Sequence, residues 1–326
     1  MNIVSGPRRK VLITGANGFI GKSLTMELMA SGFEVAAGVR QFSSELPSDA
    51  IQYELGEISS TTSWSQSLQD VDVVIHLAAR AHILKDNVSE PLIEFRKVNV
   101  DGTLNLAKQA AEKSVKQLIF ISSIGVNGNN NTRPFTELDM LNPKEAYAVS
   151  KWEAELELLA LSNETTMKMV IIRPPLVYGP HAPGNFGSLV RSMAKGIPLP
   201  FGAINNRRSF VALDNLVSFI IHCINHPKAA NEVFLISDNE DVSTSTLLRK
   251  VAKAFGLKSR LIPVPVRLMT FLAKLIGKGD VANRLFGSLQ VDSSKARDLL
   301  GWKPVITMDE QLKKTADAYL KNEKTL

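Results

Sequence analysis

Hydrophobic residues in the first half of the chain form short, nearly unbroken runs, separated by longer stretches in which apolar residues recur every three or four positions. The runs are rich in valine, isoleucine and leucine, as strands buried on both faces are, and the longer stretches are typical of amphipathic helices. The pattern predicts strands at 10–14, 34–39, 71–77, 117–122 and 168–173, and helices at 20–31, 98–113 and 146–162. We therefore expect an α/β fold built on a doubly wound parallel Rossmann sheet.

The pattern changes after Arg173, where prolines and glycines punctuate the chain and shorter elements follow. We predict a Rossmann domain over 1–173 and a smaller C-terminal substrate lobe over 174–326, with the chain crossing back near 210–240. The longest apolar run, 261–276, is interrupted by two prolines, Arg267 and Lys274. It is thus too broken for the roughly 20 apolar residues of a spanning helix. We expect a packed amphipathic helix there, with a helix lying on a membrane surface as the alternative.

The composition is that of an ordinary globular protein, with 44% apolar and 21% charged residues among 326. Lysine and arginine number 38 against 32 aspartates and glutamates, but no long basic run or aromatic interleaving accompanies the excess. Nucleic-acid binding is therefore not expected, whereas a small anionic substrate such as a nucleotide diphosphate is. The single cysteine, Cys223, fits a reducing cytoplasm, since it cannot form an intrachain disulfide.

Three glycines follow the first predicted strand directly, with the spacing Gly15-x-x-Gly18-x-x-Gly21. Gly15 allows a tight turn, Gly18 lets the backbone approach a pyrophosphate, and Gly21 allows close packing of helix on sheet. Free N–H groups and the partial positive charge at the helix start would then hold phosphates. A glycine-rich turn without ligand is the structural alternative, but the position between strand and helix favours a dinucleotide site.

The choice of dinucleotide depends on the end of the second strand. NAD sites usually carry a carboxylate there for the ribose 2′-hydroxyl, whereas this chain has Arg40 and no carboxylate. A guanidinium could bind the 2′-phosphate of NADP, although it could equally be solvated or stack on adenine. This charge argument favours NADP, with NAD as the alternative.

Tyr147 and Lys151 are four residues apart at the start of a predicted helix, so both side chains share one face. The ammonium could hold a cofactor ribose and lower the pKa of the phenol, which would let Tyr147 exchange protons near neutral pH. Ser123 follows the preceding strand, at the sheet edge where ligands bind in such folds, and could hydrogen-bond a reacting sugar oxygen. Neighbouring Ser122 is the alternative, because adjacent strand residues point to opposite faces.

These motifs, with 74–79 (VIHLAA), 99–103 (NVDGT), 172–180 (IRPPLVYGP) and 292–302 (DSSKARDLLGW), resemble the extended short-chain dehydrogenase/reductase family over nearly the whole chain. Within it the sequence is most similar to the nucleotide-sugar branch, which includes UDP-hexose 4-epimerases and the 4-keto-sugar reductases of polysaccharide biosynthesis. The resemblance implies hydride transfer at C4 of a UDP-hexose or UDP-N-acetylhexosamine. Arg40 makes an NADPH-dependent reductase our slight preference, with a 4-epimerase that keeps NAD bound as the alternative.

The resemblance also implies residue roles. Tyr147 would exchange a proton with the sugar 4-hydroxyl, Ser123 would orient that oxygen, and Lys151 would hold the ribose. The cofactor site would comprise Gly15, Asn17, Gly18, Phe19, Ile20, Gly21, Arg40, Leu77, Ala78, Ala79, Asn99, Tyr147, Lys151 and Pro174. The substrate would contact Ser123, Asn185, Arg207 and Arg284, and a homodimer is the expected assembly.

Other readings of the same residues are less well supported. Dehydration of the sugar would need an acid and a base after Ser123, and Ile124 supplies neither. His222 and His226 have helical spacing but no third ligand, so we expect packing and no metal, and His76 lies in an apolar run typical of a core histidine. A catalytically silent dinucleotide-binding regulator is the non-enzyme alternative, which the presence of both Tyr147 and Lys151 disfavours.

Overall fold

The computed structural model describes residues 8–81, 90–275, 277 and 279–323. They form two compact units. Unit 1 contains the described residues up to Val126, together with Pro143–Arg173 and Phe219–Phe234. Unit 2 contains Asn127–Asn142, Pro174–Ser218 and the described residues from Leu235 onward.

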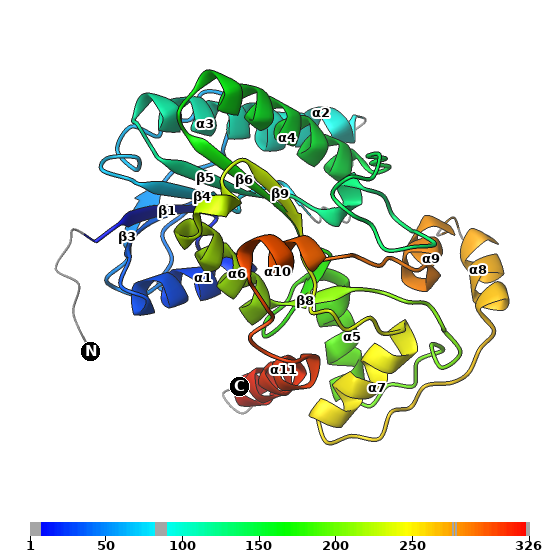
Figure 1. Ribbon diagram of the computed structural model, residues 1–326. Coiled ribbons are helices and arrows are strands. Elements are labelled where there is room, and N and C mark those ends of the chain that lie inside the picture. Colours follow the sequence, from blue (N-terminus) through cyan, green and yellow to red (C-terminus); the bar gives the residue numbers. More distant parts are fainter. Residues whose placement is uncertain (1–7, 82–89, 276, 278, 324–326) are drawn as a thin grey trace. The chain divides into compact units, whose positions relative to one another are not determined.

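Unit 1 is built on a seven-stranded sheet with the order β3-β2-β1-β4-β5-β6-β9 (Figure 1). The strands are β1 (Lys10–Thr14), β2 (Glu34–Val39), β3 (Ile51–Glu54), β4 (Val73–His76), β5 (Gln117–Ile121), β6 (Lys168–Arg173) and β9 (Glu232–Leu235). The pairs from β3 to β6 are parallel. Chain order reverses between β1 and β4, and in open α/β sheets the crevice beyond such a reversal is where ligands bind.

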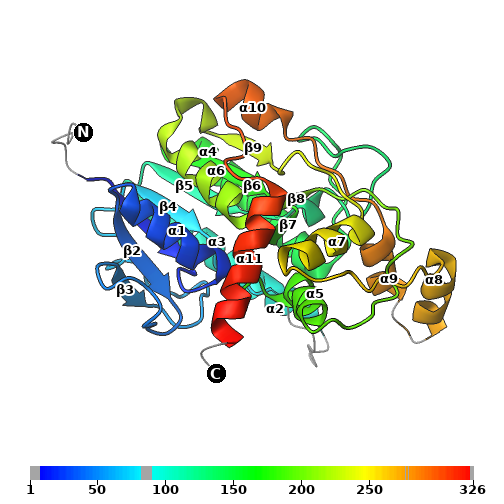
Figure 2. The ribbon, with the colours of Figure 1, turned by 90° about the horizontal axis from the view of Figure 1, so that it is seen from below.

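Helices cover both faces of this sheet. In Figures 1 and 2, α3 (Thr103–Glu112) and α4 (Ala146–Glu164) lie on one face, and α1 (Phe19–Ala30) lies on the other. The unit also contains α2 (Pro91–Arg96), the 3₁₀ turns η2 (Ile124–Val126) and η3 (Pro227–Ala229), and the end of α6 (Leu213–Asn225). A cluster of buried side chains from the sheet, α3 and α4 fills the space between them. The predicted Rossmann architecture is confirmed.

The predicted helix at 98–113 differs in one respect. A π-helical segment, η1 (Lys97–Gly102), joins α2 to α3 in place of the start of one regular helix. Single π-helical turns interrupt α-helices mainly at functional sites, and this one carries Asn99. The short strands β3 and β9 were not predicted, because four residues give too short a pattern to separate from a loop.

Unit 2 has a two-stranded parallel sheet, β7 (Leu176–Tyr178) with β8 (Phe210–Ala212), surrounded by helices. The helices are α5 (Gly184–Ala194), α7 (Thr244–Ala254), α8 (Val266–Leu275), α9 (Gly279–Phe286), α10 (Ser294–Leu300) and α11 (Met308–Glu323). Both views show α8 beside α9 (Figures 1 and 2). Asn206 ties the loop before β8 to this helical region, because its amide donates to the carbonyls of Leu285 and Gly287.

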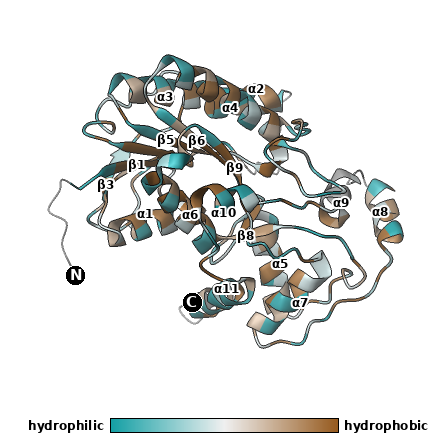
Figure 3. Ribbon diagram, in the orientation of Figure 1, coloured by the Kyte–Doolittle hydropathy of each residue, from teal (hydrophilic) through white to brown (hydrophobic). Residues whose placement is uncertain are grey.

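Helix α8 corresponds to the apolar run that was expected to pack as an amphipathic helix. The helix forms, but none of its residues is buried. Figure 3 shows hydrophobic and hydrophilic residues along it. Within the described residues, no helix is both long and apolar enough to cross a membrane.

Candidate active site

The glycine loop forms the tight strand-to-helix connection that its spacing predicts. Gly15 has φ +68°, and its N–H donates to the Gly38 carbonyl at 2.9 Å. A Cβ on Gly21 would lie 2.2 Å from the Gly15 carbonyl oxygen, so only glycine lets α1 pack this closely. A Cβ on Gly18 would meet only that same oxygen within 4 Å, which leaves open space beside the loop. The first N–H groups of α1 lack helical partners, so this loop fits a dinucleotide diphosphate.

A buried hydrogen-bonded network holds the ends of β1 and β4 together where the chain order reverses. His76 Nδ1 lies 2.6 Å from the Thr14 hydroxyl, and its Nε2 lies 2.9 Å from the Thr103 hydroxyl. The Ala78 N–H donates to the same Thr14 hydroxyl at 3.2 Å, which fixes the loop after β4. Burial, with a smaller effect of Lys151, lowers the pKa of His76 to about 3, so the ring is neutral. The expectation of a satisfied core histidine is confirmed.

Tyr147 and Lys151 both lie near the start of α4. Lys151 is 1% exposed, and its Nζ lies 3.8 Å from the centroid of the Phe120 ring on β5. Tyr147 is partly buried and makes an edge contact with Phe95, with ring centroids 6.1 Å apart. The helix therefore presents the amine of Lys151 beside Phe120 on β5, and the phenol of Tyr147 lies one turn earlier on the same helical face, against Phe95.

Burial dominates the electrostatics of this pair. It raises the pKa of Tyr147 to about 12. It lowers the pKa of Lys151 to about 7, against an opposing effect of Glu155. Removing an ammonium or a phenolate from water disfavours the charged form, which explains both directions. The expected lowering of the pKa of Tyr147 by Lys151 is thus not seen in this structure, because loss of hydration outweighs the attraction.

The two candidate serines differ in their surroundings. Ser123 is partly exposed, and its hydroxyl oxygen accepts a hydrogen bond from the Gly125 N–H at 3.1 Å, so the hydroxyl proton can be donated elsewhere. Ser122 is 3% exposed, and its hydroxyl has no partner among the described residues. This geometry favours Ser123 for a ligand that arrives from solvent, and its role stays a prediction.

Asn99 joins the segment after β4 to α4. Its side-chain oxygen accepts from the Arg80 N–H at 2.8 Å, and its amide donates to the Ser150 hydroxyl at 3.0 Å. Ser150 donates in turn to the Tyr147 carbonyl at 2.8 Å. Because Asn99 lies on the π-helical turn, this chain of bonds links that irregular segment to the first turn of α4. These contacts are structural, and the role of Asn99 in a cofactor site stays a prediction.

Sequence reasoning missed a buried ion pair below Lys151. Arg173, at the end of β6, donates to Glu155 of α4 through Nε at 3.0 Å and Nη2 at 2.5 Å. The two side chains are only 5% and 1% exposed. Glu155 follows Lys151 by one helical turn, so its negative charge lies on the same face of α4. A buried pair of this kind fixes the orientation of the helix against the sheet.

The remaining predicted residues belong to unit 2 or make few contacts. Asn185 is exposed in the first turn of α5, Arg207 is exposed before β8, and Pro174 is buried. Arg284 lies in α9, and its side chain is outside the described part of the structure. Arg40 is exposed at the end of β2. The substrate contacts of Asn185, Arg207 and Arg284 stay predictions, as does the homodimer.

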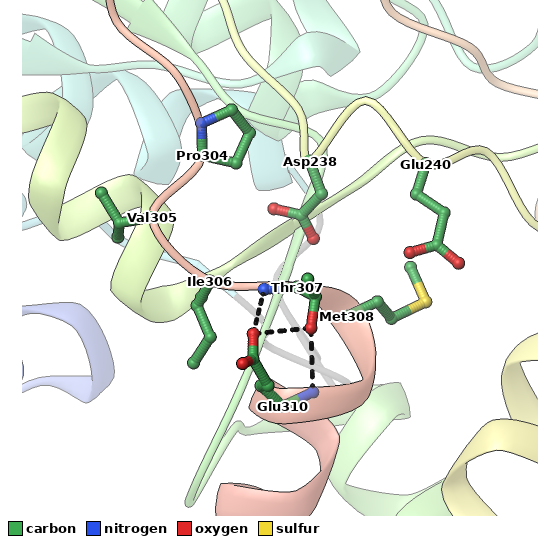
Figure 4. A pocket seen from close by; sticks show the side chains of 8 residues that line it. All are labelled: Asp238, Glu240, Pro304, Val305, Ile306, Thr307, Met308 and Glu310. Atoms are coloured by element: carbon green, nitrogen blue, oxygen red, sulfur yellow. Dashed lines mark hydrogen bonds between the residues drawn. The ribbon is translucent and has the colours of Figure 1, made fainter.

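A cavity of about 200 Å³ in unit 2 carries three carboxylates but none of the predicted site residues (Figure 4). Glu310 accepts from the N–H and hydroxyl of Thr307 at 2.8 and 2.7 Å, a cap for α11. Asp238 accepts from Tyr178 at 2.7 Å, from the Ala212 N–H and from Asn215. These acids are thus occupied in holding the unit together.

The described residues contain no group of three or more metal-ligating side chains. His222 and His226 stack on each other with ring centroids 5.4 Å apart, and Cys223 between them is buried. The pair therefore shows the packing that the sequence predicts.

Comparisons with known proteins extend the resemblance. Residues 11–237 match the NAD dependent epimerase/dehydratase family. The chain is 46% identical to a UDP-glucose 4-epimerase of Vibrio cholerae, over 96% of both chains. It is 31% identical to the N-acetyl-alpha-D-glucosaminyl-diphospho-ditrans,octacis-undecaprenol 4-epimerase of Escherichia coli O157:H7, over 82% of this chain and 81% of that one. A UDP-glucose 4-epimerase structure from Thermotoga maritima with UDP-glucose superposes with a TM-score of 0.78 at 25% identity, covering 96% and 99% of the chains.

These similarities favour the epimerase alternative and give no support to the preference for NADP or for a reductase. The absence of a carboxylate beside Arg40 removes repulsion toward a 2′-phosphate, but it does not disfavour a 2′-hydroxyl. An exposed guanidinium with no hydrogen bond among the described residues selects neither cofactor.

Proposed function

This chain belongs to the NAD-dependent epimerase/dehydratase family, and we propose that it is a 4-epimerase of a UDP-hexose. The observation that carries the substrate class is the 46% identity with the V. cholerae epimerase across 96% of both chains. The chemistry is supported by the placement of Tyr147 and Lys151 on one face of α4, beside the end of β5.

The fit of the cofactor rests on the glycine loop. The first turn of α1 offers N–H groups that have no partner within the helix, and the space beside Gly18 is open, where a side chain would obstruct a diphosphate. When bound, NAD supplies the acceptor for the hydride from C4 and the donor that returns it. Lys151 would donate hydrogen bonds to a ribose, and Asn99 would help to keep α4 in position through Ser150, to which its amide donates.

Proton transfer is assigned to Tyr147. The raised pKa of Tyr147 keeps the phenol protonated, so it can donate to a keto oxygen when the sugar is reduced again. Accepting the proton of the 4-hydroxyl requires the phenolate form of Tyr147, so its pKa must fall when ligands bind, and a protonated Lys151 nearby would lower it. Ser123, with its hydroxyl oxygen accepting from Gly125, would donate its own proton to the sugar oxygen. Every group needed for reversible proton exchange thus comes from unit 1.

The first test identifies the cofactor and the reaction. Purified protein, denatured without added dinucleotide, should release NAD, and the native protein should interconvert UDP-glucose and UDP-galactose with no cofactor added. Release of NADP, or a stoichiometric requirement for NADPH, would contradict the proposal and restore the reductase.

The second test concerns Tyr147. Tyr147→Phe should lower turnover by about a thousandfold, as loss of a general acid–base does, while the protein still retains NAD. Tyr319→Phe is the matched control, because that tyrosine lies on α11 against Phe255 and a phenylalanine preserves the ring contact. Equal turnover of the two variants would remove Tyr147 from the mechanism.

The E. coli relative supports a second candidate. Its name places the sugar on a diphospho-undecaprenol, and the 31% identity extends over 82% of this chain. In both candidate reactions the substrate is a hexose attached to a diphosphate. The substrates differ in the group at the other end of the diphosphate, which is uridine in one and undecaprenol in the other. The two candidates can be distinguished by incubating the enzyme with UDP-N-acetylglucosamine and, in detergent, with N-acetylglucosaminyl diphospho-undecaprenol. Only one of these two compounds should be epimerised at C4.

A further inference from the structure

Helix α8 exposes its largest apolar side chains. Leu268, Phe271, Leu272 and Leu275 follow the spacing i, i+3, i+4, i+7 and therefore share one face of the helix. They are 49%, 59%, 51% and 68% exposed. We call these four residues the α8 stripe. Single exposed apolar residues are common on protein surfaces, but a continuous stripe indicates an interaction site.

The opposite face of the helix is the one that contacts the rest of unit 2. Its half-buried residues are Val266, Met269, Thr270 and Ala273. Helix α9 lies against α8 (Figures 1 and 2). Half of this contacting face is small or polar, whereas the α8 stripe is uniformly large and apolar. In most surface helices the more apolar face is buried, whereas in α8 the more apolar face is the exposed one.

The chain around α8 is strongly basic. Between Asp241 and Asp280 there is no aspartate or glutamate, whereas eight cations occur. Three of them lie on α7, where Lys250 pairs with Glu240 and Asp309, and the other five are Lys258, Arg260, Arg267, Lys274 and Lys278. Arg267 and Lys274 belong to α8 itself and are exposed. They are seven residues apart, so they share one flank of the α8 stripe. Neither forms an ion pair within the part of the chain that the structure describes.

We propose that α8 docks this protein on an anionic phospholipid bilayer, with the helix parallel to the surface and the α8 stripe among the acyl chains. An in-plane helix needs leucine and aromatic residues on one face and lysine or arginine beside them, which is the composition of α8. Lipid phosphates would lie against Arg267 and Lys274, and the lack of carboxylates from 242 to 279 removes repulsion along the whole segment.

A second copy of the chain fits this surface less well. Four half-exposed side chains offer on the order of 400 Å², whereas a stable protein interface buries about 800 Å² on each partner. Two such faces would also bring the same cations together, with no carboxylate on the segment to pair with them. A bilayer needs no matching surface, so the small area and the single sign of charge favour it.

The test uses the full chain and sedimentation with vesicles. The protein should bind vesicles of mixed phosphatidylcholine and phosphatidylglycerol, and binding should weaken at high salt and on phosphatidylcholine alone. Phe271→Gln with Leu275→Gln should weaken the partition coefficient by roughly a hundredfold, because each removes an inserted apolar side chain. Arg267→Gln with Lys274→Gln should weaken it by roughly twenty-five-fold, about fivefold for each cation.

A matched control distinguishes binding through α8 from nonspecific adsorption through any exposed apolar side chain. Leu138 and Met140 are 97% and 91% exposed but flank Asp139, so Leu138→Gln with Met140→Gln should leave binding within about twofold. All variants should retain wild-type turnover on a water-soluble UDP-sugar, which shows that they fold and keeps this test separate from that of the proposed function. Failure of the wild type to bind, equal binding to neutral vesicles, or a dimer in sedimentation velocity that only the α8 variants abolish would each overturn the proposal.

Discussion

Lysine and phenylalanine side chains occur both at the carboxyl edge of the sheet in unit 1 and on α8 in unit 2. They are buried in the first region and exposed in the second. Lys151 is 1% exposed with its Nζ 3.8 Å from the Phe120 ring centroid, and Phe120 is 0% exposed. On α8, Phe271 is 59% exposed and Lys274 lies in solvent. Burial therefore separates the two regions, because it lowers the pKa of Lys151 and encloses Phe120, whereas the α8 side chains remain in contact with solvent. We therefore expect the same type of substitution to change the free energy of unfolding much more in unit 1 than on α8.

The largest difference is expected for arginine. Arg173→Met leaves the carboxylate of Glu155 buried without its partner and should lower the free energy of unfolding by about 4 kcal/mol. Arg267→Met on α8 should change it by less than about 0.5 kcal/mol, because that side chain is exposed. Urea unfolding followed by circular dichroism measures both.

The double variant Glu155→Leu with Arg173→Met serves as the control for this ion pair. It should recover most of the lost stability, since no unpaired charge remains in the interior. If Arg173→Met and Arg267→Met lowered the free energy of unfolding equally, the distinction between the two regions would be wrong.

Phenylalanine gives the next contrast. Phe120→Ala should destabilise the protein by about 3 kcal/mol, because it opens a cavity beside His76, whose ring stacks on Phe120. Phe271→Ala should have an effect below about 0.5 kcal/mol, since α8 has no buried residue. Thermal unfolding of the two variants side by side tests this, and a large loss for Phe271→Ala would show that α8 is packed in solution.

The smallest expected effect is a pH dependence. The pKa of Lys151 is about 7 in the folded protein against an ordinary value of 10.5, so the unfolded chain binds more protons between these values. Stability should therefore rise with pH in that window, and by about 2 kcal/mol from pH 7 to 9. The difference in unfolding free energy between wild type and Lys151→Met, measured across this range, should shift by that amount in favour of the wild type.

Lys274→Met is the control for this slope. Its free energy of unfolding should stay within about 0.5 kcal/mol of that of the wild type across the range, because the lysine it replaces is exposed. A constant difference for Lys151→Met as well would show that the amine of Lys151 is hydrated. The range ends at pH 9 because burial also raises the pKa of Cys223, which adds an opposing slope above its ordinary value of 9.0.

Local patterns in the sequence were enough to predict the Rossmann sheet and part of the site. Strands β1, β2 and β6 have the predicted bounds, because continuous apolar runs and the turns that end them are local features. The glycine loop and the spacing of Tyr147 and Lys151 are equally local. Geometry within one or two turns follows from the backbone alone, so spacing predicts it.

Tertiary structure decided the features that depend on distant residues. Glu155 and Arg173 meet across the interface of α4 and β6, and no sequence period links them. The environment of Lys151 on α4 likewise comes from a distant residue, Phe120 on β5. Hydrophobic periodicity identifies the α8 stripe, because spacing alone determines which side chains share a helical face. Whether that face is buried or exposed depends on the surface that the rest of the chain provides, which only the folded structure contains.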